Sequence, residues 1–281
     1  MILIADSGST KTDWSLLSPT IDVRFTTNGL NPYHQDRHQM GSVLKEVAGR
    51  IKACQSDETG SLSVYFYGSG VRPEQEAPMA DILRDSLPKV ERVETHSDLL
   101  GAARALCAHN YGIASILGTG ANSCLYDGER ILQNTPALGY ILGDEGSGAV
   151  LGKRFIHDLY TGVLSEELKV EFERRTGFSL PQIIDRVYRQ PLANRFLASL
   201  SEFIHSHLGE SAVEALVCQN FTDFIRLHIT PYGRMNLPLS FVGSIAYYYR
   251  EQLAKAVSAF GYTLGTVLRS PMEGLIRYHI C

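Results

Sequence analysis

A strand, a polar turn and a second strand occur twice in this chain, and this repeat constrains its fold most. Residues 2–5 are apolar, a turn rich in Gly, Ser and Thr follows, and residues 13–17 alternate between apolar and polar. The same order begins again at residue 111, with the turn at residues 118–122. A third strand and helical patterns follow each copy. The repeat predicts two similar α/β domains with a ligand cleft between them.

The length of 281 residues, 44% of them hydrophobic, suits two domains of ordinary size. We place the first domain at residues 1–110 and the second at residues 111–269, with a largely helical insertion from about residue 146. Residues 245–260 are predicted to form one helix. A closing helix over about residues 270–281 is expected to return to the first domain.

The net charge of -4 favours neither nucleic acid nor an anionic membrane as a partner. A small anionic ligand would have to be held by local backbone amides and bound cations. No apolar run approaches the about 20 residues of a membrane helix. The N-terminus begins with a strand and lacks the basic start of a signal peptide, so we expect a cytoplasmic location.

The first turn carries several groups that suit a nucleotide. Its candidate phosphate-binding residues are Gly8, Ser9, Thr10, Lys11 and Thr12. Amides and hydroxyls in such a turn suit phosphate oxygens, and Asp6 at the strand end could hold Mg2+ directly or through water. The alternative is an ordinary polar hairpin turn, for which two residues normally suffice. The spacing differs from that of a Walker A motif.

Two further turns extend the nucleotide hypothesis. The turn at Gly118, Thr119 and Gly120 repeats the plan of the first. Alone it would indicate a plain hairpin, but as the second of a pair it favours phosphate binding. Gly243 and Ser244 form a strand-to-helix turn where an adenine ring could pack, and a tight connection is the alternative.

Acidic residues are candidates for contacts with a substrate hydroxyl. Asp98 stands between a predicted strand and a helix, where a carboxylate could take a proton from a substrate hydroxyl. A helix N-cap is the alternative, although Ser97 could cap instead and leave Asp98 available. Glycines closely flank Asp144 and Glu145, which indicates either backbone fitted around a ligand or a loop before a helix.

The ordered series of these motifs resembles the family of N-acetylglucosamine kinases and BadF/BadG-type ATPases. The series comprises residues 6–13, Asn31-Pro32, Gly68-Ser69-Gly70, Asp98, residues 118–122, residues 143–147 and Val242-Gly243-Ser244. The resemblance covers nearly the whole chain, and the Gly-Asp-Glu-Gly-Ser run is its most specific part. It implies an α/β fold of two ribonuclease-H-like, actin-like ATPase domains flanking an ATP and substrate cleft.

The resemblance also implies roles for residues. Thr10 and Thr119, with their glycines, would contact the β- and γ-phosphates of ATP, and Ser244 would lie near the adenosine. Asp6 would organise Mg2+, and Asp98 would be the general base. The implied sugar-binding residues are Asn31, Asp98, Ala121, Asn122, Ala137, Leu138, Gly139 and Asp144. Leu138 stands where the animal enzymes of this family have tryptophan.

The implied reaction transfers a phosphoryl group from ATP to an amino sugar, N-acetylglucosamine or a relative such as N-acetylmuramic acid, at the 6-hydroxyl. Such enzymes commonly form homodimers, although no sequence feature shows an interface here. One alternative is a BadF-type activator ATPase, for which Cys107 and Cys124 would be the candidate iron–sulfur ligands. Another is a non-catalytic regulator that binds sugar or nucleotide.

Overall fold

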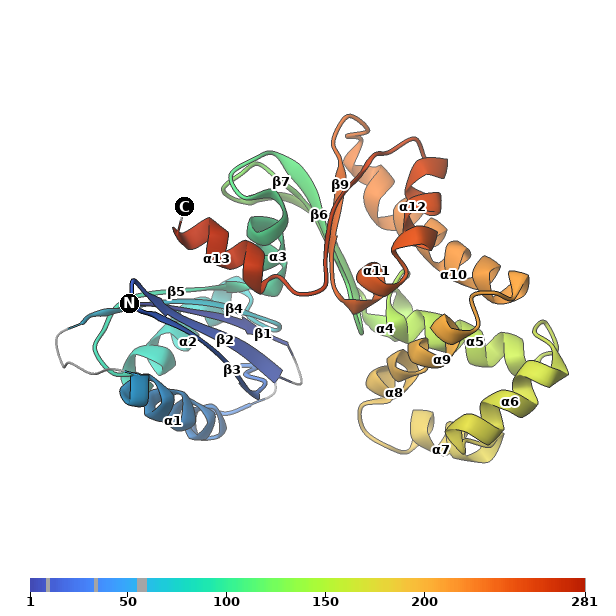
Figure 1. The fold of residues 1–281 in the computed structure, drawn as a ribbon, viewed down its shortest axis with the longest axis horizontal. Coiled ribbons are helices and arrows are strands. Elements are labelled where there is room, and N and C mark those ends of the chain that lie inside the picture. The colour runs from blue at the N-terminus through green and yellow to red at the C-terminus, as the bar shows by residue number, and fades with distance from the viewer. Residues whose placement is uncertain (9–10, 33–34, 55–59, 281) are drawn as a thin grey trace. The chain divides into compact units, whose positions relative to one another are not determined.

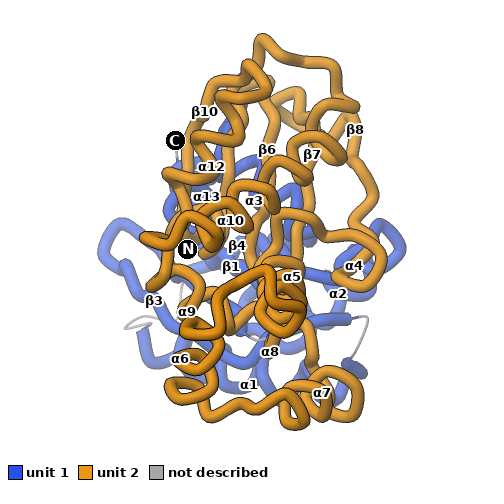
Figure 2. The backbone as a smooth tube through the Cα atoms, turned by 90° about the vertical axis from the view of Figure 1, so that its right-hand side faces the viewer, with its two compact units in different colours: residues 1–109, 271–281 blue, residues 110–270 orange. Residues whose placement is uncertain are grey.

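The computed structural model describes residues 1–8, 11–32, 35–54 and 60–280. Contacts divide the chain into two compact units, residues 1–109 with 271–281, and residues 110–270 (Figure 2). Each unit is built on a five-stranded mixed sheet with helices (Figure 1). The predicted α/β class is therefore confirmed, whereas the proposal that each unit is a separate domain stays a prediction.

The sheet of the first unit has the strand order β3-β2-β1-β4-β5. Its first three strands form an antiparallel meander, and β4 and β5 continue the sheet in parallel with β1. In chain order the elements are β1 (Ile2–Ser7), β2 (Lys11–Ser18), β3 (Ile21–Asn28), α1 (Arg37–Cys54), β4 (Leu62–Gly68), α2 (Pro73–Ser86), β5 (Val90–Ser97), α3 (Asp98–Cys107) and, from the chain end, α13 (Met272–Ile280).

Alternation along the strands gives this sheet two buried faces. Leu3, Trp14 and Phe66 lie in the core with apolar residues of α1 and α2. On the opposite face, Ile4 and Tyr67 pack with residues of α3 and α13. Figure 1 shows the two pairs of helices on opposite sides of the sheet. The start of α3 is thus held directly after β5, at the carboxyl ends of the parallel strands.

The second unit repeats this topology. Its sheet has the order β10-β9-β6-β7-β8, which matches the first sheet when read from the other end. The strands are β6 (Gly112–Leu117), β7 (Ala121–Tyr126), β8 (Ile131–Thr135), β9 (Leu239–Val242) and β10 (Leu264–Leu268). Again three strands form an antiparallel meander and two add in parallel to its first strand. The sequence repeat therefore corresponds to a structural one.

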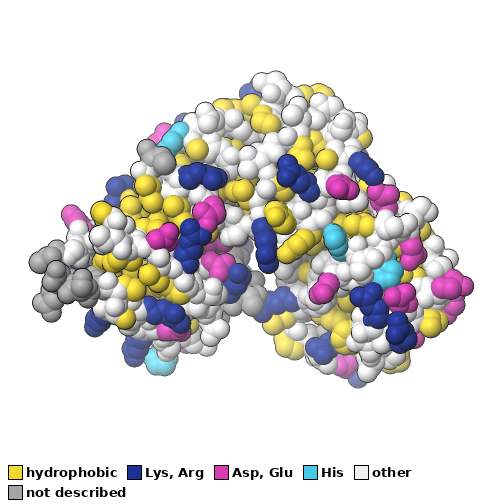
Figure 3. Space-filling view, viewed as in Figure 1, with side chains coloured by type: hydrophobic (Ala, Val, Ile, Leu, Met, Phe, Trp, Pro, Cys, Tyr) yellow, Lys and Arg dark blue, Asp and Glu magenta, His cyan; other side chains and the backbone are white. Residues whose placement is uncertain are grey.

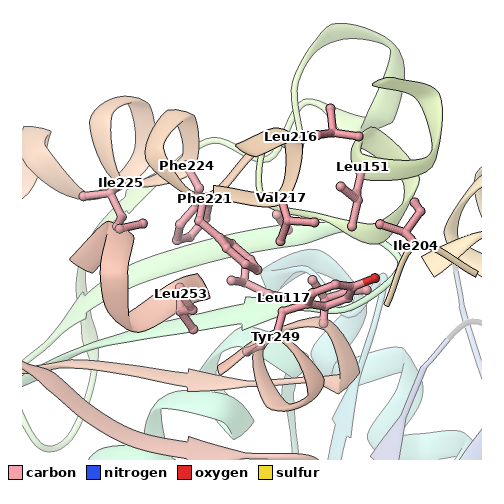
Figure 4. Close-up of a cluster of buried hydrophobic side chains, with 14 of the residues drawn as sticks. Leu117, Leu151, Ile204, Leu216, Val217, Phe221, Phe224, Ile225, Tyr249 and Leu253 are labelled. Carbon is pink, nitrogen blue, oxygen red and sulfur yellow. The ribbon is translucent and has the colours of Figure 1, made fainter. Parts of the chain in front are cut away.

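Helices cover one face of the second sheet. They are α4 (Gly139–Leu142), α5 (Gly148–Tyr160), α6 (Glu166–Thr176), α7 (Leu180–Tyr188), α8 (Ala193–Ser199), α9 (Ser201–Ser206), α10 (Ser211–Phe224), the π-helix η1 (Ile225–Ile229), the 3-10 turn η2 (Thr230–Tyr232), α11 (Ser244–Tyr248) and α12 (Arg250–Ala259). Figure 4 shows Leu117 of β6, Leu151 of α5 and Phe221 of α10 in their common core. This core fixes the end of β6 against α5 and α10.

The single helix predicted over residues 245–260 is wrong, because the chain breaks at Tyr249 between α11 and α12. The backbone of Tyr249 has φ -102° and ψ 30°, outside the helical range. Its ring is buried, and its hydroxyl donates to the carbonyl of Ser201 at 2.5 Å. Burial of this side chain overrides the local helical pattern.

The surface carries both signs of charge. On the face shown in Figure 3, basic and acidic side chains are interspersed over both units. Within the part of the chain that the structure describes, no helix has the length and apolar character needed to cross a membrane.

Candidate functional site

The parallel strands of the first unit bring candidate residues to one edge of the sheet. Ser7 of β1 pairs with Gly68 of β4, and Gly68 pairs with Ser97 of β5. Asp6 therefore lies at the same edge as Asp98, the first residue after β5. With strands about 4.8 Å apart, their backbones are separated by roughly 10 Å. The fold thus brings together the predicted metal ligand and the predicted base.

Asp6 has an unusual proton affinity. Burial, followed by the nearby carboxylates of Asp98 and Asp13, raises its pKa to about 7, against the opposing charge of Lys11. A carboxylate crowded by others gains from a bound divalent cation, and Mg2+ prefers such hard oxygen ligands. Among the described residues, no three His, Cys, Asp or Glu side chains gather as a metal site. The carboxylate of Asp6 has the oxygen chemistry that Mg2+ prefers, and its role as a metal ligand stays a prediction.

Asp98 occupies the first turn of α3. Ser97 is the N-cap and accepts a hydrogen bond from the Leu100 amide at 3.3 Å, which confirms that Ser97 can cap this helix. Burial raises the pKa of Asp98, while the amides of Leu99 and of Asp98 itself hydrogen-bond the carboxylate and oppose the rise. A desolvated carboxylate is a stronger base than an exposed one. Its role as catalytic base stays a prediction.

Hydrogen bonds and an ion pair hold the described residues of the first turn. The Gly8 amide donates to the Lys11 carbonyl at 3.0 Å. The hydroxyl of Thr12 is 2.7 Å from that of Ser7, so it has an internal partner. The Lys11 ammonium lies 2.7 Å from a carboxylate oxygen of Asp13. The remaining residues predicted to bind phosphate, Ser9 and Thr10, lie outside the described residues.

Asn31 is buried against the turn at residues 68–70. The backbone amide of Asn31 donates to Gln35 Oε1 at 2.8 Å. Gly70 has φ 83°, and a Cβ there would lie 2.3 Å from Asn31 Oδ1. Ser7 connects this segment to the first turn, because its hydroxyl bonds both backbone groups of Leu30. Asn31 is thus held at the same strand edge as Asp6.

In the second unit, the hairpin turn at residues 118–120 meets the start of α5. The amides of Gly148 and Ala149 donate to the carbonyls of Gly118 and Thr119 at 2.8 and 3.2 Å. Ser147 is the N-cap of α5 and accepts from the Val150 amide at 3.1 Å. The structure therefore brings together the second phosphate-loop candidate and the acidic glycine-rich segment.

Asp144 is the centre of the candidate acceptor site in this unit. The Gly139 amide donates to its Oδ1 at 3.0 Å, and the Ala121 amide also bonds the carboxylate. Oδ2 lies 3.0 Å from the position that a Cβ would take on Gly120. Burial raises the pKa of Asp144, and these hydrogen bonds oppose the rise. Four predicted residues thus converge here.

The other predicted sugar contacts of this unit are less closely gathered. Asn122 accepts from the amide nitrogen of Asn134 at 2.9 Å, so its carbonyl oxygen has a partner on β8. Ala137 and Leu138 are exposed, Leu138 to 57%. Their contribution to binding stays a prediction.

Gly243 lies beside the end of β6. Its φ is 124°, and a Cβ there would stand 2.3 Å from the Leu117 carbonyl. Its amide donates to the Leu268 carbonyl at 3.0 Å. The turn to α11 therefore passes next to the 118–120 hairpin only because residue 243 has no side chain. Ser244, the first residue of α11, is exposed.

Two polar residues near Asp144, Asn220 and His228, were not predicted as parts of a site. The Gly146 amide donates to Asn220 Oδ1 at 3.2 Å, and His228 Nε2 lies 2.9 Å from Glu145 Oε2. Asn220 and His228 are far from residues 144–146 in sequence, so no motif spacing joins them. Their polar character within a largely apolar helical run is the one available signal.

Comparison with known proteins identifies the family. The structure resembles that of a proposed N-acetylglucosamine kinase from Porphyromonas gingivalis with a TM-score of 0.94. The two sequences are 50% identical over 99% of this chain and 98% of the other. The chain belongs to this N-acetylglucosamine kinase family. No protein-family profile and no curated protein matches the sequence.

More distant members of the structural group share the fold alone. A proposed N-acetylglucosamine kinase from Chromobacterium violaceum is 16% identical over 99% of this chain and 98% of its own, with a TM-score of 0.76. The ROK hexokinase from Thermus thermophilus is 13% identical, with a TM-score of 0.50 and coverage of 99% and 97%. The fold of the family is thus that of sugar kinases and actin-like ATPases.

Proposed function

We propose that this protein is an ATP-dependent kinase that phosphorylates an amino sugar. N-acetylglucosamine or a relative such as N-acetylmuramic acid is the acceptor, and its 6-hydroxyl receives the phosphoryl group. The observation that carries the proposal is the strand register that places Asp98 and Asp6 at the same edge of the sheet, where burial raises the pKa of both carboxyl groups. The relative from Porphyromonas gingivalis, itself a proposed N-acetylglucosamine kinase, supports the choice of sugar.

In this proposal the two hairpin turns hold the phosphates of ATP. The amides of Gly8 and Gly118 donate to the carbonyls of Lys11 and Gly120, so other backbone amides of the two turns would be the donors to phosphate oxygens. The hydroxyls of Thr10 and Thr119 would add to them. Lys11 supplies a positive charge, and Ser9 and Thr12 complete the first turn. Gly243 and Ser244 pack beside the adenosine.

Asp6 holds the divalent cation that accompanies ATP. The pKa of about 7 indicates a carboxylate that is costly to ionise in the free protein and that a cation would stabilise. When bound at Asp6, Mg2+ would supply positive charge to stabilise the transferred phosphoryl group and its leaving oxygen. Asp13 and Asp98 add negative charge around the same position.

Asp98 accepts the proton of the acceptor hydroxyl as the phosphoryl group is transferred. Its raised pKa makes it a better proton acceptor than an exposed aspartate. Asn31 and Asp144 bind other hydroxyls of the sugar and fix its orientation. Such positioning supplies a large part of the rate acceleration in phosphoryl transfer.

The activator ATPase is the weaker alternative. Burial raises the pKa of the Cys107 thiol to about 11, which disfavours the thiolate that an iron–sulfur cluster requires. Cys124 is fully buried in the second sheet. A non-catalytic regulator would retain ligand binding without turnover, so an activity assay distinguishes it from the kinase.

A coupled assay of ADP release tests the proposal. The purified protein is given MgATP with N-acetylglucosamine, N-acetylmuramic acid, glucosamine or glucose. We expect one of the amino sugars to stimulate ADP release at least about tenfold over the rate without sugar. Equal ADP release with and without every sugar would reject the kinase and favour an ATPase or a regulator.

A further inference from the structure

His228 is a buried histidine that the proposed mechanism does not use. It lies in the π-helix η1, and its ring stacks on that of Phe224 with centroids 5.3 Å apart and an interplanar angle of 21°. Short π-helical turns are often found at functional sites, because the extra residue redirects a side chain. The position of this ring therefore has a specific cause in the backbone.

The backbone of His228 is fastened to the second sheet. Its carbonyl accepts hydrogen bonds from the hydroxyls of Ser123 on β7 and Thr135 on β8, at 3.3 and 3.0 Å. Tyr232 strengthens the junction, because its hydroxyl bonds both Ser123 and the Thr135 amide. With its backbone held, the ring of His228 has little freedom to turn away.

The ring reaches Glu145, the neighbour of Asp144. Nε2 lies 2.9 Å from Oε2. Although burial opposes it, the hydrogen bond with His228 is the leading cause that lowers the pKa of Glu145, so the carboxylate is ionised and His228 donates. His228 is buried and Glu145 is partly buried, and the reduced access of water strengthens the bond between them.

The segment that this bond holds is strained. Asp144 has φ 60°, a left-handed conformation that residues other than glycine rarely adopt. Such a conformation persists only where the surrounding contacts impose it. The Ser147 amide donates to the Asp144 carbonyl at 3.0 Å, and Gly146 has φ 84°. The backbone on both sides of Asp144 is therefore tightly specified.

A single row of side chains provides these contacts. Asn220, Phe224 and His228 follow one another at intervals of four residues along α10 and η1. Asn220 accepts from the Gly146 amide, Phe224 packs where a Cβ of Gly146 would be, and His228 holds Glu145. This spacing places them on one face of the helical run. These three side chains form the surface against which residues 144–147 pack.

We propose that His228, acting through Glu145, is a positioning residue that holds the Asp144 carboxylate in its sugar-binding orientation. The proposal rests on the function proposed above, in which Asp144 binds a sugar hydroxyl. It explains why a hydrogen-bonded polar pair occupies a place that apolar side chains could fill, since a buried polar pair adds little net stability.

Two variants distinguish the role of the His228 N–H from the role of its ring. His228→Phe keeps the stack on Phe224 and removes the donor, whereas His228→Gln keeps an N–H at a similar reach. We expect His228→Phe to raise KM for the sugar about tenfold with KM for ATP within about threefold, and His228→Gln to restore most of the loss. The matched control is His157→Phe, because His157 pairs with Asp158 at 2.9 Å on the exposed surface.

A double-mutant cycle tests whether the effect passes through Asp144. In an Asp144→Asn background, adding His228→Phe should change KM for the sugar less than about twofold. Multiplying effects in the double variant would overturn the proposal. So would equal losses for ATP and sugar, or a normal KM for sugar in His228→Phe.

Hydrogen exchange provides a readout that needs no sugar turnover. Amides in residues 139–147 should exchange about tenfold faster in His228→Phe than in the natural chain, and unchanged in His157→Phe. Unchanged exchange in His228→Phe would overturn the proposal. An inactive natural chain with faster exchange in the variant would reject the kinase and leave the positioning role supported.

Discussion

The carboxylate of Asp98 acts on that of Asp6 across the edge of the first sheet. After burial, Asp98 is the strongest cause that raises the pKa of Asp6 to about 7. The register of β1, β4 and β5 produces this proximity, because their carboxyl ends stand side by side. The coupling joins the proposed base to the proposed cation ligand, and it makes the free protein sensitive to pH.

Ionisation of Asp6 should lower the free energy of unfolding of the ligand-free protein as pH rises. Its pKa is raised from 3.8 to about 7, so between these values the native state binds more protons than the unfolded state. Stability from this group is therefore lost as pH rises through that window. The Tm of Asp6→Asn minus that of the natural chain should increase from pH 5 to pH 8. A constant difference across this range would contradict the shift.

Asp98→Asn should lower turnover with sugar by about 100-fold or more, because the variant cannot accept the hydroxyl proton. The variant keeps the size of the side chain, so affinity for ATP should stay within about threefold. The measurements are kcat from the coupled assay and nucleotide binding by calorimetry. Near-normal kcat would remove Asp98 from the role of base.

Gly70→Ala should disturb Asn31. An alanine Cβ would lie 2.3 Å from Asn31 Oδ1, and φ at Gly70 is 83°. We expect KM for the sugar to rise about tenfold, equivalent to about 1.4 kcal/mol of lost binding. Gly177→Ala is the matched control, since φ there is 71° and no atom lies within 4 Å. A normal KM in Gly70→Ala would mean that Asn31 does not bind the sugar.

Gly243→Ala should weaken ATP binding and stability together. The added Cβ would stand 2.3 Å from the Leu117 carbonyl, which directly precedes the 118–120 turn. Gly162→Ala has φ 79° and open space, so it shares the backbone strain of about 1 kcal/mol without the clash. Thermal unfolding and nucleotide titration measure both effects. Equal behaviour of the two variants would show that the close approach at Gly243 has no role.

The sequence predicted the fold where the signal is local. Turn residues after residue 5 and after Leu117 marked both hairpins, and their common plan led to the repeated topology. Ser97 as an N-cap was also accessible, since a serine before a helical pattern is a strong start signal. The break at Tyr249 was missed because it depends on burial of that ring among residues remote in sequence.

The candidate site was predictable only in part, because some of its contacts join residues that are remote in sequence. Asp144 stood out because glycines flank it, yet its left-handed backbone and its bond from Gly139 depend on the folded loop. His228 carries no motif, and its contact with Glu145 spans 83 residues. Residues that support a ligand-binding residue from a distant helix leave no spacing pattern in the chain.

In the proposed function, this protein transfers phosphate from ATP to an amino sugar. Phosphorus NMR of a reaction with MgATP and the most stimulating amino sugar tests it most directly, because the product itself is observed. We expect a new phosphomonoester signal, coupled to the protons on carbon 6 of the sugar, to grow as ATP is consumed. Consumption of ATP with ADP and inorganic phosphate as the only new phosphorus signals would contradict it.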